Sequence, residues 1–170
     1  MAKKETIHFV ITGGTIDSHW EVSKDTVVPL EKSAIPPFMS ILNLYSPLKY
    51  TLVCLKDSRD LTKKDLKNIA NTIEKSRHKK IIVTHGTYTM QGTATYLIRH
   101  LRRSDQTIIF TGSFIPVSGF APTDAAFNLG YALAKAQDLP PGIYICMHGR
   151  VFKAGFVVKD VKKGVFKTKK

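Results

Sequence analysis

Short runs of hydrophobic and β-branched residues recur along the chain, and several of them end at glycine, threonine or serine. Such runs, bounded by turn-forming residues, are typical of buried β-strands. We therefore expect central strands over residues 6–12, 50–55, 80–84, 107–111 and 143–147. The sequence from residue 151 onward predicts one or two further short strands at an edge of the sheet.

Between these strands, apolar residues recur every three or four positions, which is the spacing of amphipathic helices. The clearest helix begins at Thr62, where Asp65 three residues later completes a capping box. Further helices are expected over residues 38–42, 90–101 and 123–137. Strands that alternate with helices predict βαβ units. The expected fold class is α/β, a single-domain three-layer sandwich with a mainly parallel central sheet over residues 1–170.

Residues 17–37 interrupt this pattern with charged residues, serines and three prolines, Pro29, Pro36 and Pro37. We expect a long loop there, with a short hairpin near residues 26–28. Loops of this length inside a compact domain are often lids or binding loops.

The remaining composition is that of a globular protein with one sizeable core, since 43% of the 170 residues are hydrophobic. We find no signal peptide and no apolar run long enough to span a bilayer, so we expect a cytoplasmic protein with no membrane contact. Cys54 and Cys146 lie inside apolar runs and are expected to be buried free thiols. Neither Cys-x-x-Cys nor His-x-x-x-His spacing occurs, which predicts no metal site.

The net charge of +13 is unusual for such a domain. It can indicate contact with nucleic acid or with an anionic surface. The segment from Arg150 to Lys170 holds eight basic residues against one acid, Asp160. Because lysines dominate there and aromatic residues that could stack on bases are sparse, we do not expect nucleic-acid binding. Residues 160–170 are instead interpreted as a solvated, flexible basic tail.

Three of the predicted strands end at corners with the same chemistry, in which glycine stands beside hydroxyl residues. These corners are Thr12–Thr15, Thr84–Thr87 and Thr111–Ser113. The carboxyl ends of parallel strands lie at one edge of a sheet, where ligands bind, so we expect the corners to meet there. Glycine lets the backbone amides approach a ligand, and such amides bind anions or an oxyanion. The alternative is that the threonines only cap helices.

Nucleotide cofactors fit these corners poorly. Gly13-Gly14 lacks the Gly-x-Gly-x-x-Gly spacing of a dinucleotide site, and no Walker loop is present. A threonine hydroxyl can act as a nucleophile when a base or a lowered pKa activates it. His85 is a candidate general base, although a structural histidine bonded to nearby backbone is an equal alternative.

The corner sequences resemble those of the bacterial-type L-asparaginases. Residues 12–16 (Thr-Gly-Gly-Thr-Ile) are similar to the first threonine signature of that family, and residues 84–90 (Thr-His-Gly-Thr-Tyr-Thr-Met) to the second. Residues 57–60 (Asp-Ser-Arg-Asp) resemble its substrate-carboxylate segment. Residues 111–116 and 124–129 match the segment after its fourth strand. The resemblance covers residues 6–149 and implies the fold of the asparaginase N-terminal domain.

This resemblance implies an amidohydrolase that converts asparagine or a related small amide to an acid and ammonia. Thr15 would be the nucleophile, Thr87 the second threonine that positions or activates water, and Ser58 the ligand of the substrate carboxylate. The other expected substrate contacts are Gly14, Arg59, Gly86, Tyr88 and Ser113. No cofactor or metal is implied, and a homodimer is expected.

Two positions depart from the family pattern. Tyr88 stands where the family has an aspartate that holds the substrate ammonium, and the position of the family's triad lysine falls at Leu139, one helical turn after Lys135. The chain resembles a group of short, single-domain asparaginase-like proteins. Two alternatives therefore stay open: a catalytically impaired relative that binds a small amino acid or amide, and a basic protein that binds nucleic acid or an anionic surface.

Overall fold

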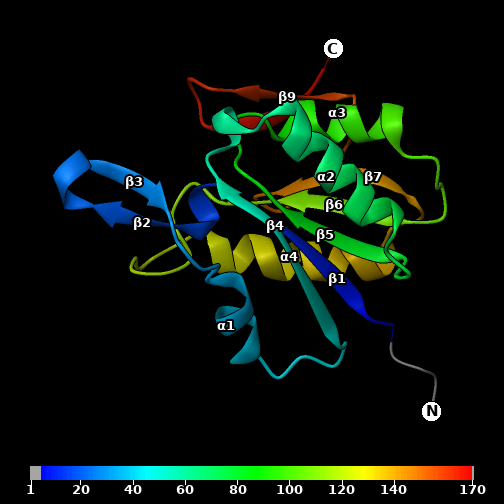
Figure 1. Ribbon diagram of the computed structural model, residues 1–170, viewed down its shortest axis with the longest axis horizontal. Coiled ribbons are helices and arrows are strands. Elements are labelled where there is room, and N and C mark those ends of the chain that lie inside the picture. Colours follow the sequence, from blue (N-terminus) through cyan, green and yellow to red (C-terminus); the bar gives the residue numbers. More distant parts are fainter. Residues whose placement is uncertain (1–4, 170) are drawn as a thin grey trace.

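The central sheet of the computed structural model has six strands in the order β4-β1-β5-β6-β7-β8 (Figure 1). The structure describes residues 5–169. The strands from β4 to β7 are parallel, and β8 pairs antiparallel with β7, so the predicted α/β class and mainly parallel sheet are confirmed. The strands are β1 (Ile7–Gly13), β4 (Leu48–Lys56), β5 (Lys80–Thr84), β6 (Thr107–Thr111), β7 (Gly142–Met147) and β8 (Arg150–Lys153).

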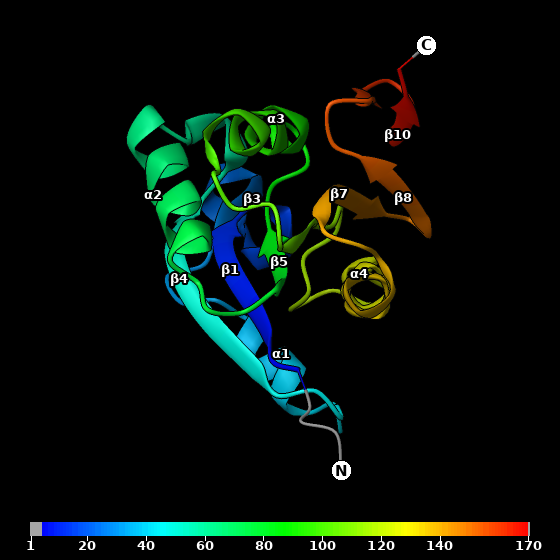
Figure 2. The ribbon, with the colours of Figure 1, turned by 90° about the vertical axis from the view of Figure 1, so that its right-hand side faces the viewer.

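Helices cover both faces of this sheet. Viewed along the sheet, α2 (Lys63–Glu74) and α3 (Met90–His100) lie on one face and α4 (Ala125–Asp138) on the other, with α1 (Ile35–Ser40) beside it (Figure 2). Two buried clusters fill the interfaces, one containing residues of α2 and α3 and the other residues of α1 and α4. The three layers of the predicted sandwich are therefore present, and α2 begins with the predicted capping box of Thr62 and Asp65.

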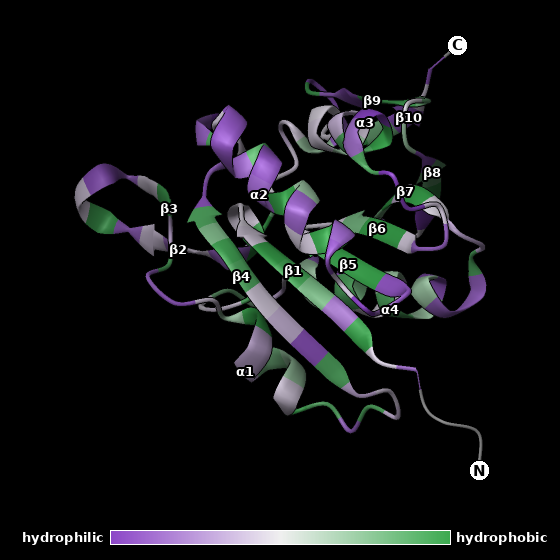
Figure 3. Ribbon diagram, turned by 45° about the vertical axis from the view of Figure 1, so that its right-hand side comes forward, coloured by the Kyte–Doolittle hydropathy of each residue, from purple (hydrophilic) through white to green (hydrophobic). Residues whose placement is uncertain are grey.

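The central strands are buried on both faces, which explains why they appear in the sequence as nearly continuous hydrophobic runs. Every residue of β1 is buried. Figure 3 shows hydrophobic colours along β1, β5 and β6, whereas α2 presents mainly hydrophilic residues. None of the helices within residues 5–169 is long and apolar enough to cross a membrane.

The segment over residues 17–37 contains more structure than the sequence predicted. β2 (Ser18–Glu21) and β3 (Thr26–Pro29) form an antiparallel hairpin, joined by the 3-10 helix η2 (Val22–Lys24), that projects from the body of the fold (Figure 1). Helix α1 then begins at Ile35, earlier than the predicted 38–42. Pro36 and Pro37 suggested a loop, but proline fits the first turn of a helix, whose amide groups have no partner within the helix.

The basic segment at the end of the chain also folds. β9 (Val157–Asp160) and β10 (Val165–Thr168) form a second antiparallel hairpin that packs beside α3. The side chains of Val157 and Phe166 are buried in the core cluster on that face of the sheet. Within the expected tail over 160–170, residues 165–168 form a strand and Phe166 is buried, while most other described residues of this segment are exposed. Lys170 lies outside the described residues.

Glycines bring the predicted corners into backbone contact. Gly14 has a φ of +87°, and a Cβ atom there would lie 2.3 Å from the backbone nitrogen of Gly86. A Cβ on Gly86 would lie 2.7 Å from the Cβ of Ser58, and one on Gly112 would lie 2.3 Å from the carbonyl oxygen of His85. Real Cβ contacts are never so short, so only glycine permits this packing. The three corners therefore meet at the carboxyl edge of the sheet, as predicted.

Replacing Gly14 by alanine is expected to destabilise the protein by about 3 kcal/mol or more, because it combines a strained φ with a backbone collision. The measurement is the free energy of unfolding from urea titration. Gly130→Ala is the control, since nothing lies within 4 Å of a Cβ at this exposed position of α4. The control should stabilise the helix by about 0.5–1 kcal/mol. Equal stabilities of the Gly14→Ala variant and the wild type would contradict the corner packing.

Candidate functional site

A cavity of about 230 Å³ lies where the corners meet. It brings together six of the residues predicted from the sequence, which are Thr15, Ser58, Arg59, Gly86, Thr87 and Tyr88. Asp57, Phe114 and Lys159 complete its lining, and the sequence interpretation had given none of these three a role. Hydroxyl groups, one carboxylate and two cations thus surround a space large enough for a small organic molecule.

Thr15 begins the 3-10 helix η1 (Thr15–Asp17) directly after the Gly14 corner. Its side chain is half-buried and has no hydrogen-bond partner within residues 5–169. The hydroxyl group of Thr87 is more enclosed and is held by a lysine. Two threonines with different environments therefore line one cavity, and the hydroxyl of Thr15 is available to a ligand.

Lys159 reaches this cavity from β9. Its Nζ atom donates a hydrogen bond to Thr87 Oγ1 at 2.7 Å and lies 4.7 Å from the ring centroid of Phe114. Its backbone nitrogen donates to Gln91 Oε1 at 2.9 Å, which fixes the strand beside α3. Burial lowers the pKa of Lys159, and the charge of Asp57 opposes this shift. The ammonium is therefore easier to deprotonate than that of an ordinary lysine.

The structure places a lysine in the cavity, Lys159, although the sequence has leucine, Leu139, where the resemblance places the family's triad lysine. Lys135, the nearest candidate in the sequence, lies on α4 and pairs with Asp138 at 3.6 Å, away from the cavity. The stretch Val157-Val158-Lys159-Asp160 has the composition of a strand and could have indicated that Lys159 is held in the fold. The many neighbouring lysines made Lys159 look like one more exposed residue of a basic tail.

Ser58 and Arg59 belong to the 3-10 helix η3 (Ser58–Asp60) at the end of β4. Ser58 Oγ accepts a hydrogen bond from the Thr89 backbone nitrogen at 3.3 Å, and its own proton has no acceptor among the described residues. Arg59 binds the Asp57 carboxylate through Nε and Nη2, each at 2.9 Å. This pairing holds the pKa of Asp57 below its usual value.

His85 is a structural residue rather than a base in this cavity. It is completely buried, it does not line the cavity, and its Nδ1 lies 2.8 Å from the carbonyl oxygen of Gly86. Burial lowers its pKa to about 4, so the ring is neutral at physiological pH. A neutral imidazole whose Nδ1 carries the proton donates to Gly86 and orients the corner that leads to Thr87.

Two predicted site residues do not reach the cavity. Gly14 packs against Gly86 behind the lining, and the hydroxyl of Ser113 donates to the carbonyl oxygen of Ile115. Thr12 likewise serves the fold, because its hydroxyl donates to the Thr84 carbonyl oxygen at 2.8 Å. Thr12 therefore joins two neighbouring strands, a role that differs from both ligand binding and the helix capping considered as the alternative.

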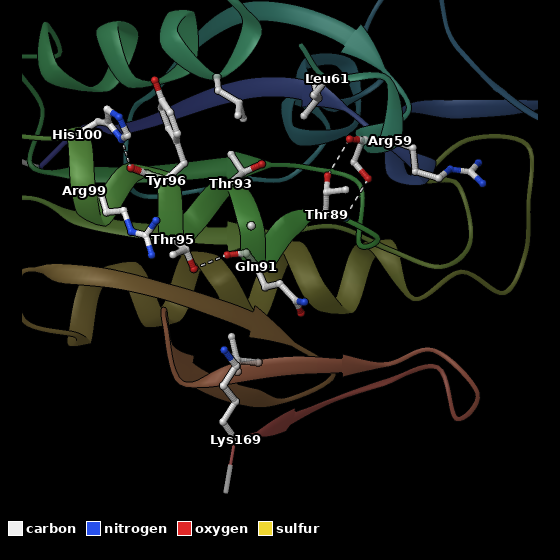
Figure 4. Close-up of a pocket in the computed structure, with 14 residues that line it drawn as sticks. Arg59, Leu61, Thr89, Gln91, Thr93, Thr95, Tyr96, Arg99, His100 and Lys169 are labelled. Atoms are coloured by element: carbon white, nitrogen blue, oxygen red, sulfur yellow. Dashed lines mark hydrogen bonds between the residues drawn. The ribbon is translucent and has the colours of Figure 1, made fainter. Parts of the chain in front are cut away.

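A larger cavity of about 600 Å³ lies next to this one, between α2, α3 and the final hairpin (Figure 4). Figure 4 shows Arg59 at one end and Arg99 and His100 at the other. The two cavities share Ser58 and Arg59, but the larger one contains none of the residues Thr15, Thr87 and Lys159. Of these two cavities, only the smaller one brings Thr15, Thr87 and Lys159 together.

Comparison with known proteins identifies relatives of the whole arrangement. Residues 6–165 match the family described as "Asparaginase, N-terminal". A glutaminase-asparaginase of Acinetobacter glutaminasificans is 27% identical over 177 residues, which cover 95% of this chain and 50% of the relative. L-asparaginase 1 of Escherichia coli K12 is 28% identical over 152 residues, which cover 81% of this chain and 42% of the relative. The chain thus spans about half the length of these relatives.

Solved structures show the same fold. The thermostable L-asparaginase from Thermococcus kodakarensis superposes with a TM-score of 0.83 at 24% identity, over 96% of this chain and 51% of that protein. A probable cytoplasmic L-asparaginase from Campylobacter jejuni gives a TM-score of 0.78 at 22% identity, over 97% of this chain and 53% of that protein. Together with the match over residues 6–165, these findings establish that the chain belongs to the asparaginase family, to whose N-terminal domain it corresponds.

Proposed function

We propose that this protein is an asparaginase-like amidohydrolase, which converts a small amide and water into a carboxylate and ammonia. The observation that carries the proposal is the hydrogen bond from Lys159 Nζ to Thr87 Oγ1, at 2.7 Å, in the cavity that Thr15 also lines. Named relatives with the same domain are asparaginases, which supports the same reaction class. The absence of a cofactor requirement stays a prediction.

Thr15 is the proposed nucleophile. Its Oγ1 would add to the amide carbon, and the hydroxyl proton would pass to the amide nitrogen, so that collapse of the tetrahedral intermediate breaks the carbon–nitrogen bond, releases ammonia and leaves an ester with Thr15. Water would then hydrolyse this ester, giving the acid and restoring the threonine. The half-buried position of Thr15 without a side-chain partner suits a group that must meet a substrate.

Thr87 and Lys159 supply the proton transfer in this scheme. With the neutral amine, Lys159 would accept a proton through the Thr87 hydroxyl from the water that attacks the ester. Because burial lowers the pKa of Lys159, its neutral amine forms at a lower pH than that of an ordinary lysine. Phe114 packs against Lys159 and limits the water around it, which is consistent with burial as the main cause of the shift.

The same residues can orient the substrate. Ser58 has a hydroxyl proton to donate to a substrate carboxylate, and Arg59 lies beside it. The backbone at Gly86 approaches the cavity without a side chain, so its amides can serve a developing oxyanion. Gly14 supports this corner from behind. A binding role for Ser113 stays a prediction, since its hydroxyl donates to Ile115.

A catalytically impaired relative is the second candidate function, and Tyr88 favours it. The phenol cannot act as the counter-ion that an aspartate would be for a substrate ammonium, and 55% of the Tyr88 surface is exposed. Such a protein would bind a small amino acid or amide without turnover.

We also propose a homodimer, as expected from the sequence, which sedimentation equilibrium would distinguish from a monomer.

Thr15→Ala is expected to reduce ammonia release by about a thousandfold or more, because it removes the proposed nucleophile. The measurement is ammonia production from a panel of small amides, including asparagine, at high concentration. Thr26→Ala, at an exposed position of the β2–β3 hairpin, is the control and should leave turnover unchanged. Turnover that survives in the Thr15→Ala variant would exclude Thr15 as the nucleophile.

Lys159→Met should lower turnover by about a hundredfold or more, as expected when a general base is lost. Lys162→Met, an exposed lysine that follows β9, is the matched control. In the wild type, turnover should rise with pH as Lys159 loses its proton and reach a plateau below the ordinary lysine pKa of 10.5, because burial lowers the pKa of this group. An unchanged pH profile in the Lys159→Met variant would contradict the assignment.

A further inference from the structure

The cavity around Thr15 has few charges, and their arrangement indicates what it can bind. Among the described residues that line it, Arg59 and Lys159 are the basic residues and Asp57 is the one acid. The remaining lining residues are uncharged hydroxyl, aromatic and glycine residues. The charge of the lining is therefore positive when Lys159 is protonated and neutral when it is not.

The carboxylate of Asp57 is already occupied. Its Oδ1 accepts hydrogen bonds from the Arg59 backbone nitrogen at 2.8 Å and from Arg59 Nε at 2.9 Å, and its Oδ2 accepts one from Arg59 Nη2 at 2.9 Å. Both oxygens are thus bonded to a single neighbouring residue. A substrate ammonium would have to compete with a bidentate arginine for this carboxylate.

Tyr88 also lines the cavity, and its phenol adds no carboxylate. The Arg59 guanidinium lies 5.6 Å from its ring centroid and Lys159 Nζ lies 5.9 Å from it. The ring face is therefore already approached by two cations of the protein. An ammonium supplied by a substrate would meet the like charge of Arg59 and, when Lys159 is protonated, a second like charge, while the one carboxylate of the lining, Asp57, is already paired with Arg59.

Donors to an anion, by contrast, are available. The hydroxyl proton of Ser58 has no acceptor among the described residues, and Arg59 keeps its Nη1 donors after binding Asp57. The protein as a whole carries a net charge of +13, which favours the approach of anions. The cavity therefore offers a carboxylate unused donors, whereas it offers an ammonium only a carboxylate that already binds Arg59.

We propose that the substrate is an ω-amide that bears a carboxylate and no free ammonium group, such as the monoamide of a simple dicarboxylic acid. This inference rests on the proposed amidohydrolase function and specifies its substrate class. The carboxylate lies on Ser58 and Arg59, and the amide carbon faces Thr15. Hydrolysis breaks the carbon–nitrogen bond of the amide, adds the oxygen of water to the carbon and yields a dicarboxylate and an ammonium ion.

The test compares three amides that share the group CH₂–CO–NH₂. Succinamate has a carboxylate alone, asparagine has a carboxylate and an ammonium, and 3-aminopropanamide has an ammonium alone. Ammonia release should give a kcat/KM for succinamate that exceeds that for asparagine by about tenfold or more, with 3-aminopropanamide slowest. A higher kcat/KM for asparagine than for succinamate would overturn the proposal.

A variant tests whether the missing counter-ion sets this preference. Tyr88→Asp should lower the ratio of succinamate to asparagine turnover by about tenfold or more, because it supplies a carboxylate for the ammonium. Tyr45→Asp is the matched control, since Tyr45 is 84% exposed and precedes β4 at the opposite edge of the sheet. A ratio that stays unchanged in the Tyr88→Asp variant would contradict the proposed basis of selection.

Binding of the products separates this inference from the proposed function. Succinate and aspartate differ only in the ammonium group, and their dissociation constants can be measured by calorimetry. If no amide is hydrolysed, the amidohydrolase proposal fails, and the preference for ligands without an ammonium group is then tested by binding alone. Binding of succinate about tenfold tighter than that of aspartate supports this preference, whereas tighter binding of aspartate, or no binding of either, overturns it.

Discussion

The backbone contact between the Gly14 and Gly86 corners is the constraint on which the site depends. A Cβ atom at either position would collide with the neighbouring corner or with Ser58. The absence of a side chain at both positions therefore allows the two corners to pack against each other and against the segment after β4. Hydrogen bonds reinforce this contact, from the Gly14 backbone nitrogen to the Lys56 carbonyl oxygen and from Thr12 to Thr84. Thr15, Ser58 and Thr87 then surround one cavity, although they are far apart in the sequence.

The proposed chemistry also depends on a residue near the end of the described chain. Lys159 arrives on the β9–β10 hairpin, which is anchored by buried Val157 and Phe166 and by the bond to Gln91. Burial of the amine between Phe114 and the body of the protein lowers its pKa, while Asp57, neutralised by Arg59, opposes this only in part. Burial in this fold thus makes Lys159 a candidate base. The pairing of Asp57 with Arg59 leaves the cavity without an unpaired carboxylate.

Much of the fold could be predicted from the sequence, because strands buried on both faces are visible as hydrophobic runs and parallel topology brings their ends together. The corner residues were predicted for the same reason. Lys159 was missed because its contact with Thr87 joins residues 72 positions apart and depends on a hairpin packed over α3. The hairpin expected near residues 26–28 is present, but its first strand and the start of α1 were not predicted, because charged residues and prolines are compatible with both loops and short ordered elements. Domain organisation, location in the cell and oligomeric state remain predictions.

The assignment of Thr15 as the nucleophile is tested most directly by rapid-quench mass spectrometry during turnover of an amide, with hydroxylamine omitted and then added as a competing acceptor. Thr15 and Thr87 fall in different tryptic peptides, residues 5–24 and residues 81–99, so an acyl group can be located. The structure predicts an acyl adduct on the peptide of residues 5–24 that hydroxylamine removes as a hydroxamate. Turnover with the adduct on residues 81–99, or turnover with neither adduct nor hydroxamate, would contradict a threonine mechanism centred on Thr15.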